Sequence, residues 1–361
     1  GALLPPSVTR WGKRRVLINK TLEVAMEPQV SVCVLAYNHE PYIAQCLQSI
    51  LAQQTSFDFE IIARDDASTD GTAKVLQEFA EQYPHKIRLI LEPHNTFADP
   101  AYKPVFGRVF APVARGRYLA TCEGDDYWTD PTKLQRQFDY MQAHPSCVLC
   151  CHATSIVRED GEASAMRLSF GNEDKDVTCD DIMTSWAQTQ SFGITSLHPS
   201  SWFSRRQMDL DYAASWHLST SAGDFARACY FSHLAPVHYM ARPMSAYRYL
   251  AAQSWTAKAE KSVQVLASHY KDYIETAQQI DELTNREHHD TAMIGCKQRA
   301  LLLAGMTSGR AFFKSQLGAP IAPYLTASDH LTLLALRLLN ALGLRPARNN
   351  DTGRVVLSRK G

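Results

Sequence analysis

From residue 30 onward, two hydrophobic patterns alternate along the chain. Strand-like apolar runs lie at 30–36, 59–63, 86–91 and 117–122. The segments 42–54 and 72–82 lie between them and carry apolar residues at helical spacing. Strands that alternate with helices predict an α/β domain with a doubly wound sheet, joined by right-handed crossovers.

The second half of the chain follows another pattern. Past residue 151 come mixed polar and aromatic segments, and then helical spacing at 258–279, 290–313 and 328–342. We therefore divide the chain into an N-terminal extension, an α/β domain in two halves and a C-terminal helical region, at 1–28, 29–152, 153–257 and 258–361.

Leucines cover more than one narrow stripe of the segment 328–342. Burial against the body of the protein is the default interpretation. The alternative is an amphipathic helix on a membrane surface, assisted by the arginines that follow it.

Composition is that of an ordinary globular protein, with 45% apolar and 20% charged residues. Lys plus Arg equals Asp plus Glu at 37 each, so the overall charge does not indicate a polyanionic partner. Both ends of the chain are nevertheless locally basic. No signal-like segment and no apolar run long enough to span a membrane is evident, so we expect a cytoplasmic protein.

Nine cysteines are scattered through apolar runs, which is typical of reduced, buried thiols. Cys147, Cys150, Cys151 and His152 could form half of a zinc site, but no second Cys/His pair stands at suitable spacing. A core strand is the favoured interpretation of this segment.

Polar residues follow three of the predicted strands. Tyr37 and Asn38 follow the first, Asp66 the second, and Asp125 and Asp126 a later one. Each group alone could be a capped turn. Strand ends of an α/β sheet gather at one edge, however, where such sheets bind ligands. A pair of adjacent carboxylates favours Mg²⁺ or Mn²⁺ carrying a phosphate, so the sequence predicts a functional site there.

In their order and spacing, four motifs resemble the family 2 glycosyltransferases of the GT-A fold. The resemblance covers residues 29–152 closely and 190–256 more loosely. It implies a mixed, doubly wound sheet flanked by helices, with 29–152 as the nucleotide-binding half. The motifs are Val30-Ser31-Val32-x-Val34-x-Ala36-Tyr37-Asn38, Asp65-Asp66-x-Ser68-Thr69-Asp70-Gly71-Thr72, Ala114-Arg115-Gly116-Arg117-Tyr118 and Glu123-Gly124-Asp125-Asp126-Tyr127-Trp128-Thr129-Asp130-Pro131-x-Lys133-Leu134-x-x-Gln137.

The resemblance also implies roles for individual residues in binding a nucleoside-diphosphate sugar. Asp66 would accept a hydrogen bond from the base, Asp125 would touch the ribose and the metal shell, and Asp126 would bind Mn²⁺ or Mg²⁺ directly. The strand-end residues that would help to hold the base are Ala36, Tyr37 and Asn38.

Asp224 resembles the catalytic base of the family. An inverting transfer needs a carboxylate that takes the proton of the acceptor hydroxyl as it attacks the anomeric carbon. The alternative is that Asp224 only caps the helix that begins at Phe225.

The chain departs from the family pattern at Leu250, where relatives often have a histidine that binds metal or diphosphate. Diphosphate, water or another side chain such as His198 or His238 could replace it. Arg64 also stands where many relatives have a small or apolar residue. It could contact a diphosphate, but we expect it to be exposed at the strand end. Candidates for contact with the acceptor or the diphosphate are Trp128, Arg248 and Trp255, with packing as the favoured role of Trp128.

The expected function is metal-assisted, inverting transfer of a sugar to an acceptor hydroxyl, in bacterial surface glycan synthesis at the inner face of the plasma membrane. A nucleotidyltransferase lacks its glycine-rich loop, a dinucleotide oxidoreductase lacks Gly-x-Gly-x-x-Gly, and no nucleic-acid module is evident. The remaining alternative is a catalytically impaired module that binds nucleotide or glycan.

Overall fold

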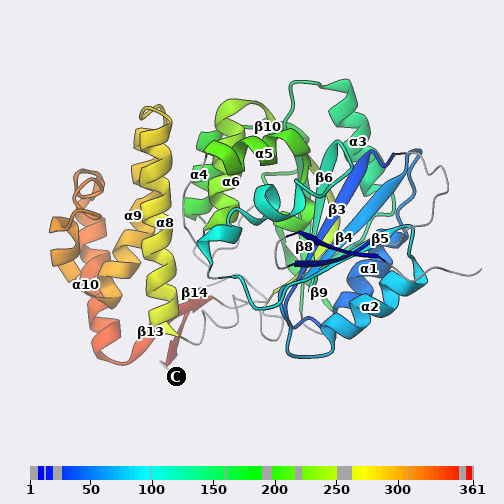
Figure 1. Cartoon of the computed structure of the whole chain (residues 1–361). Coiled ribbons are helices and arrows are strands. Elements are labelled where there is room, and N and C mark those ends of the chain that lie inside the picture. Colours follow the sequence, from blue (N-terminus) through cyan, green and yellow to red (C-terminus); the bar gives the residue numbers. More distant parts are fainter. Residues whose placement is uncertain are drawn as a thin grey trace, which may run out of the picture.

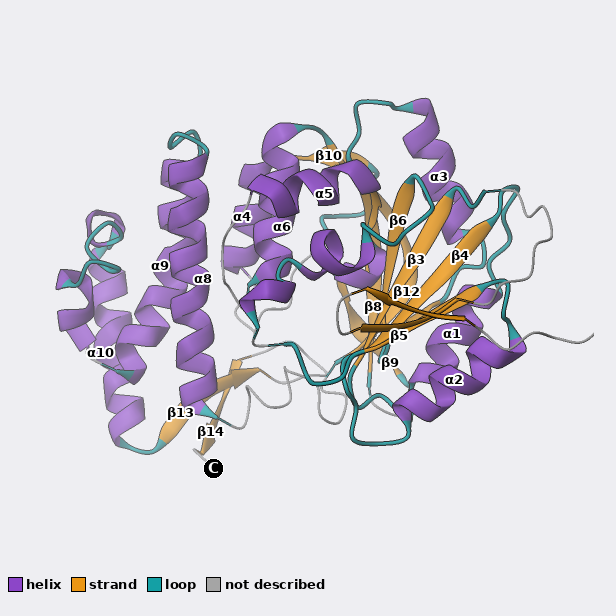
Figure 2. Ribbon diagram, viewed as in Figure 1, coloured by secondary structure: helices purple, strands orange, loops and turns teal. Residues whose placement is uncertain are grey.

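The structure is a computed structural model that describes residues 7–11, 14–18, 27–97, 99–158, 161–188, 197–215, 222–249, 262–307, 309–348 and 355–359. A mixed sheet flanked by helices forms one side of the molecule, and the C-terminal helices stand on the other (Figure 1). Figure 2 shows the fan of parallel strands with helices on both faces.

The first half of the α/β domain, residues 29–152, follows the predicted alternation closely. Its strands and helices are β3 (Val30–Ala36), α1 (Ile43–Leu51), β4 (Phe59–Asp65), α2 (Thr72–Gln82), β5 (Ile87–Leu91), the single-turn helices Pro100–Tyr102 and Phe106–Phe110, β6 (Tyr118–Glu123), β7 (Tyr127–Trp128) and α3 (Lys133–Ala143).

Parallel pairing brings the strand ends to one edge of the sheet. β3 pairs in parallel with β4 on one side and with β6 on the other, and β4 pairs in parallel with β5. Every residue of β4 is buried, and α1 covers the sheet with Ile43 and Leu47. Burial on both faces explains why these strands read as continuous apolar runs rather than as alternating ones.

The following half completes the sheet with strands of both directions. Its elements are β8 (Leu149–Val157), β9 (Ala163–Leu168), β10 (Lys175–Val177), α4 (Cys179–Gln188), β11 (Phe203–Arg205), α5 (Arg206–Ser215), α6 (Gly223–Leu234) and β12 (Val237–Arg248). β11 runs antiparallel between β6 and β8, while β12 is parallel to β8. The predicted mixed sheet flanked by helices is confirmed.

The N-terminal extension contributes two strands that the sequence pattern did not predict. β1 (Ser7–Trp11) and β2 (Arg14–Ile18) form an antiparallel pair. β2 continues the main sheet beside β5. The extension is therefore part of the sheet.

The predicted C-terminal helices are present, with shifted ends. They are α8 (Val263–Leu283), α9 (His289–Met306) and α10 (Ala327–Ala341), followed by the hairpin of β13 (Leu344–Arg348) and β14 (Val355–Arg359). Trp186 of α4, Phe225 of α6 and Tyr273 of α8 form a cluster of rings whose centroids lie 4.5 to 5.4 Å apart. One hydrophobic core thus crosses the proposed boundary at residue 257, which stays a prediction.

The cysteines agree with the strand interpretation. Cys150 and Cys151 lie in β8, and all nine cysteines are buried and free of disulfides. Among the described residues, no helix is long and apolar enough to span a membrane.

Helix α10 corrects the default interpretation of its leucines. Leu333 is buried with 1% exposure, as expected for packing against the body. Four others are exposed by 54 to 72% and share one side of the helix, because they are spaced by three or four residues. This leucine face consists of Leu331, Leu334, Leu338 and Leu342.

Candidate active site

Backbone hydrogen bonds join the ends of three strands into one surface. The Asp66 N–H donates to the Ala36 carbonyl at 2.9 Å, and the Gly124 N–H donates to the Leu35 carbonyl at 2.9 Å. The Asn38 N–H donates to the Ser68 hydroxyl at 2.9 Å. The predicted gathering of these strand ends at one edge is confirmed.

Asp66 is buried in an ion-paired cluster. Its Oδ1 accepts hydrogen bonds from Arg64 at 2.9 Å, the Thr96 N–H at 3.0 Å and the Thr96 hydroxyl at 2.7 Å. Arg64 is 2% exposed and also donates to Glu92 at 2.9 Å, so the expectation of an exposed strand-end arginine was wrong. The buried carboxylates supply the pairing that a buried guanidinium requires. Arg64 therefore holds Asp66 in place.

The residues at the end of β3 and just after it differ in exposure. Ala36 is fully buried, while Tyr37 and Asn38 are partly exposed at the edge. Asn38 adopts a left-handed conformation with φ of 57°, which asparagine tolerates well. Its Oδ1 accepts a hydrogen bond from the Thr69 N–H at 2.8 Å. Asn38 thus ties the two loops together at the place where a base would bind.

A glycine allows the loop of Asp125 to lie close to β3. A Cβ added at Gly124 would stand 2.7 Å from His39 Nδ1 and 3.1 Å from the Ala36 Cβ. His39 Nε2 in turn lies 3.6 Å from Asp125 Oδ2. Any side chain at position 124 would push this loop away from the strand ends.

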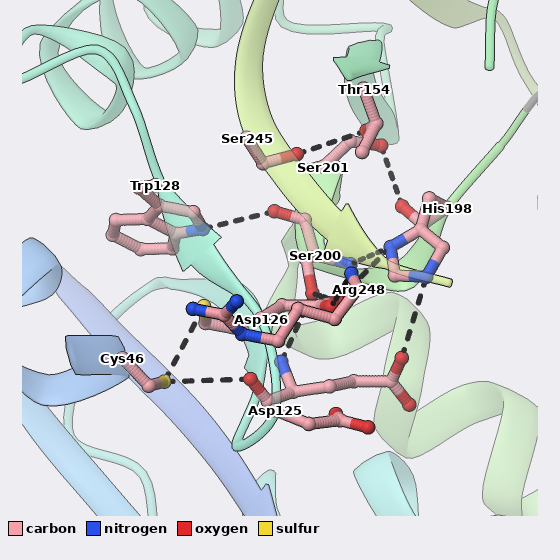
Figure 3. A network of polar contacts seen from close by, with 12 residues as sticks. Cys46, Asp125, Asp126, Trp128, Thr154, His198, Ser200, Ser201, Ser245 and Arg248 are labelled. Atoms are coloured by element: carbon pink, nitrogen blue, oxygen red, sulfur yellow. Dashed lines mark hydrogen bonds and ion pairs between the residues drawn. The ribbon is translucent and has the colours of Figure 1, made fainter. Parts of the chain in front are cut away.

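Asp126 is the most buried carboxylate of the site, with 1% exposure. Its Oδ1 accepts from the backbone N–H of Arg248 at 3.1 Å, and its Oδ2 accepts from the Ser200 hydroxyl at 2.6 Å (Figure 3). The Ser200 hydroxyl also accepts from the Glu123 N–H at 3.0 Å. Residues from β6, β12 and the turn Pro199–Ser201 therefore fix this carboxylate.

Glu123, Asp126 and His198 present a set of ligand atoms that lie within 4.8 Å of one another. His198 Nδ1 is 3.5 Å from Asp126 Oδ2, and His198 Nε2 is 3.6 Å from Glu123 Oε2. With Asp125 beside them we call these four residues the acidic corner. Carboxylate oxygens with one imidazole form a donor set that suits Mn²⁺ and is compatible with Mg²⁺, so the residues fit the expected metal.

Burial and mutual repulsion perturb the titration of the acidic corner. Burial and the charges of Asp126, Asp125 and Asp224 raise the pKa of the Glu123 carboxyl well above its usual range. Burial and the charge of Asp125 do the same to the pKa of Asp126. Burial lowers the pKa of His198 to about 3, which keeps the imidazole neutral, as a metal ligand must be. A divalent cation would relieve this repulsion.

Asp224 lies in the first turn of α6, close enough for its charge to raise the pKa of Glu123. The N-cap of α6 is Ala222 and makes no side-chain cap hydrogen bond, so Asp224 stands inside the helix rather than at its cap. Burial raises the pKa of Asp224, which favours a role as proton acceptor near neutral pH. The structure thus brings the candidate base and the acidic corner together.

The structure describes two of the three residues predicted to contact the acceptor or the diphosphate. Trp128 is 4% exposed and its indole N–H donates to the Ser200 carbonyl at 3.0 Å, which agrees with packing and not with acceptor contact. The Arg248 guanidinium lies over the rings of Tyr42 and Tyr127, about 5 Å away. Trp255 and Leu250 lie outside the described residues.

Of the two histidines proposed to replace the family's ligand, only His198 reaches the acidic corner. His238 lies at the start of β12, whereas Arg248 at the end of that strand meets Asp126. His238 pairs instead with Asp176 at 2.8 Å.

Sequence reasoning assigned no role to Glu123 or Ser200. Glu123 stood in the quoted motif beside two more obvious carboxylates. Ser200 lies in a turn without hydrophobic periodicity, and only the folding of β11 beside β6 brings that turn to the acidic corner. Residues far apart in sequence thus contribute to one site.

This combination defines a class: an α/β domain of GT-A architecture with a carboxylate-rich site at the strand ends. The model of the family described as "Glycosyl transferase family 2" matches residues 31–197. Residues 31–197, just under half of the chain, therefore carry a family 2 glycosyltransferase domain.

Two relatives illustrate the similarity. An uncharacterized protein of Mycobacterium tuberculosis is 43% identical over 132 residues, 37% of each chain. The putative teichuronic acid biosynthesis glycosyltransferase TuaG of Bacillus subtilis is 33% identical over 135 residues, 37% of this chain and 50% of that protein. The matches thus span half or less of these relatives.

A solved structure extends the likeness of the fold beyond the domain. The crystal structure of S. aureus TarS residues 1–349 in complex with UDP-GlcNAc aligns with 92% of this chain and 97% of that chain. Its TM-score is 0.52 at 17% sequence identity. The GT-A fold followed by C-terminal helices is therefore shared.

Proposed function

We propose that the protein transfers a sugar from a nucleoside-diphosphate sugar to an acceptor hydroxyl, with inversion at the anomeric carbon. The observation that carries this proposal is the arrangement of Asp224 beside the acidic corner. One carboxylate group is free to accept a proton, while the others suit a cation that carries a diphosphate. The family to which residues 31–197 belong supports the same reaction.

Each residue of the site has a separate role in a single displacement at the anomeric carbon. Asp126, Glu123 and His198 would hold Mn²⁺ or Mg²⁺, which supplies positive charge to the departing diphosphate. Asp125 stands beside them and is suited to the ribose. Asp224 removes the proton of the acceptor hydroxyl, and its raised pKa matches that task. No covalent intermediate is needed.

The nucleotide base is uracil or thymine. Asp66 Oδ1 already accepts three hydrogen bonds, from Arg64 and from the Thr96 amide and hydroxyl, which leaves Oδ2 as its available acceptor. Uracil and thymine each present a single N3–H donor to such an oxygen. Guanine presents two adjacent donors, which match a carboxylate with both oxygens free. The UDP-GlcNAc bound by TarS agrees with this choice.

A thermal-shift screen of nucleoside diphosphates tests the site. UDP with Mn²⁺ should raise the melting temperature, GDP with Mn²⁺ should raise it less, and Asp66→Asn should remove the difference. Release of UDP from a UDP-sugar then tests turnover. No stabilisation by any nucleoside diphosphate would contradict the proposed function, and binding without turnover would favour a module that only binds.

The protein works at the inner face of the plasma membrane, on glycan acceptors of the cell surface. TuaG, whose name places it in teichuronic acid biosynthesis, supports this setting. The leucine face supports it too, because large apolar side chains exposed together on one helix favour an apolar surface.

The basic residues near the leucine face favour an anionic lipid surface as its partner. The last 35 residues contain more basic than acidic side chains. The basic ones are Arg337, Arg345, Arg348, Arg354, Arg359 and Lys360, and the acidic ones are Asp329 and Asp351. An apolar helix face combined with basic residues is typical of helices that lie in the interface of anionic membranes.

A further inference from the structure

A second cluster of metal-ligating side chains lies far along the chain from the acidic corner, where α6 meets the turn between α8 and α9. His233 stands in the last turn of α6, and Glu287 and His288 precede α9. Their ligand atoms lie within 4.8 Å of one another. We propose that His233, Glu287 and His288 bind a zinc ion, which clasps the catalytic domain to the C-terminal helices.

The distances between the ligand atoms match a tetrahedral zinc site. His233 Nδ1 lies 3.3 Å from His288 Nε2. Two nitrogens bound to one tetrahedral zinc at about 2.0 to 2.1 Å are separated by about 3.3 Å. The two rings are nearly perpendicular at 87°, so their nitrogens converge on a point and the rings do not stack.

A hydrogen bond alone does not account for Glu287. Its Oε2 lies 3.8 Å from His233 Nδ1, which is beyond hydrogen-bond range. This separation is also wider than the about 3.3 Å expected between two ligands of one tetrahedral zinc. The Glu287 side chain is 63% exposed, so it has room to turn toward an ion held by the two imidazoles.

Asp180 supplies the outer contact that metal-binding histidines usually have. Its Oδ1 lies 3.2 Å from His288 Nδ1. A carboxylate that accepts the Nδ1–H proton leaves Nε2 as the ligand atom and orients the ring. Asp180 belongs to the first turn of α4, so three separate parts of the chain meet here.

Charge also favours a cation in this position. The two carboxylates of the cluster, Glu287 and Asp180, together carry a charge of −2, which one divalent ion neutralises. The carbonyl end of α6 adds the negative end of a helix dipole. Imidazole with one carboxylate suits zinc among the common divalent ions, and three protein ligands leave a fourth position for water.

The consequence is a clasp on the helix that carries the candidate base. Asp224 lies in the first turn of α6 and His233 lies in the last. Zinc would fix the far end of α6 to the α8–α9 turn and to α4. The clasp does not depend on the proposed transferase reaction.

Zinc titration of the full chain after treatment with EDTA tests the site. Calorimetry should show saturable zinc binding, and zinc should raise the melting temperature. His233→Gln and Glu287→Gln should weaken this binding by more than about tenfold, and Asp180→Asn by about 10- to 100-fold. Co²⁺ in place of zinc should give the intense visible absorption of a tetrahedral site.

Two controls make the result decisive. His289→Gln changes the neighbouring histidine, which pairs with Asp281 at 2.6 Å, and should bind zinc as the wild type does. Asp126→Asn should keep the zinc-dependent stabilisation, which separates this cluster from the acidic corner.

A wild type without saturable zinc binding, or Gln variants that bind zinc as tightly as the wild type, would show an ordinary hydrogen-bond chain and overturn the proposal. Glu287 is largely exposed, so its variant should fold even if a histidine variant does not.

Discussion

The acidic corner and the leucine face are opposite departures from the usual distribution of side chains. In the first, an ionisable carboxyl group is buried, because Asp126 is 1% exposed. In the second, apolar groups are exposed, up to 72% at Leu342. Buried charges need a counter-charge and exposed apolar patches need a cover. These needs are the reason for the two partners proposed above, a cation with a nucleotide for the acidic corner and an apolar surface for the leucine face.

The two regions also differ in how tightly their side chains are held. Ser200 and the Arg248 backbone fix Asp126 from two sides, whereas the leucine face projects from a single helix. Changes in the acidic corner should therefore alter chemistry, while changes on the leucine face should alter location alone.

The largest effect is expected from Asp224→Asn. Loss of the general base should lower turnover by about 10² to 10⁴, with UDP binding unchanged. Asp290→Asn is the matched control, since Asp290 also lies in the first turn of a helix but outside the site. Turnover of Asp224→Asn within a few-fold of the wild type would remove the assigned base.

The second largest effect is expected from replacement of Leu334 and Leu338 by Ser. Each leucine that leaves the lipid should weaken binding to anionic vesicles at least about tenfold, because burial of a leucine contributes about 1.5 to 3 kcal/mol. Co-sedimentation measures this loss, and turnover on a soluble acceptor should stay normal. Leu333→Ser is the contrast: its side chain is buried, so it should lower the free energy of unfolding by about 2 to 5 kcal/mol. Vesicle binding that survives the double replacement would contradict the membrane proposal.

Ser200→Ala should have a smaller effect. It removes the hydroxyl that donates to Asp126 Oδ2, and outer contacts of this kind change metal affinity by about 10- to 100-fold. Mn²⁺ titration in the presence of UDP measures the change. Thr121→Val, which alters a buried hydroxyl in β6, the strand that ends at Glu123, should leave the affinity unchanged.

The smallest effect concerns the pH dependence of stability. Burial lowers the pKa of Lys133 to about 7, so above that pH the folded chain holds it neutral, while the unfolded chain keeps it protonated up to about 10.5. The unfolded state binds more protons in this window. The free energy of unfolding should therefore rise with pH, by up to about 1.4 kcal/mol per unit.

Lys133→Met provides the comparison for this effect. Urea unfolding at pH 7 and pH 9 should show a gain for the wild type relative to the variant. A difference between the two proteins that stays constant with pH would show that Lys133 remains charged in the fold.

The hydrophobic pattern predicted the part of the fold in which each strand can be recognised from its own apolar run. Continuous apolar runs identified β3, β4 and β6, and their parallel order placed Asp66 and Asp126 at one edge. The hydrophobic pattern did not predict features that depend on contacts between residues far apart in the sequence. Strands β1 and β2 form because β5 offers an open edge, and Arg64 is buried because Glu92 and Asp66 accept its charge.

The candidate site could likewise be predicted only in part from the sequence. Asp126 and Asp224 were assigned through motifs, while His198 was one of several open choices for the missing ligand. Choosing between His198 and His238 required the direction of β12 and the position of the Pro199–Ser201 turn. Those are properties of the folded chain.

The hydrogen bond from the backbone of residue 248 to Asp126 has an evolutionary consequence. Because the donor is a main-chain amide, substitution of Arg248 by any residue except proline can keep this contact. A one-residue deletion between Ser245 and Arg248 would instead move the amide out of position. Selection at this point should therefore conserve the length of β12 more strictly than the identity of its last residue.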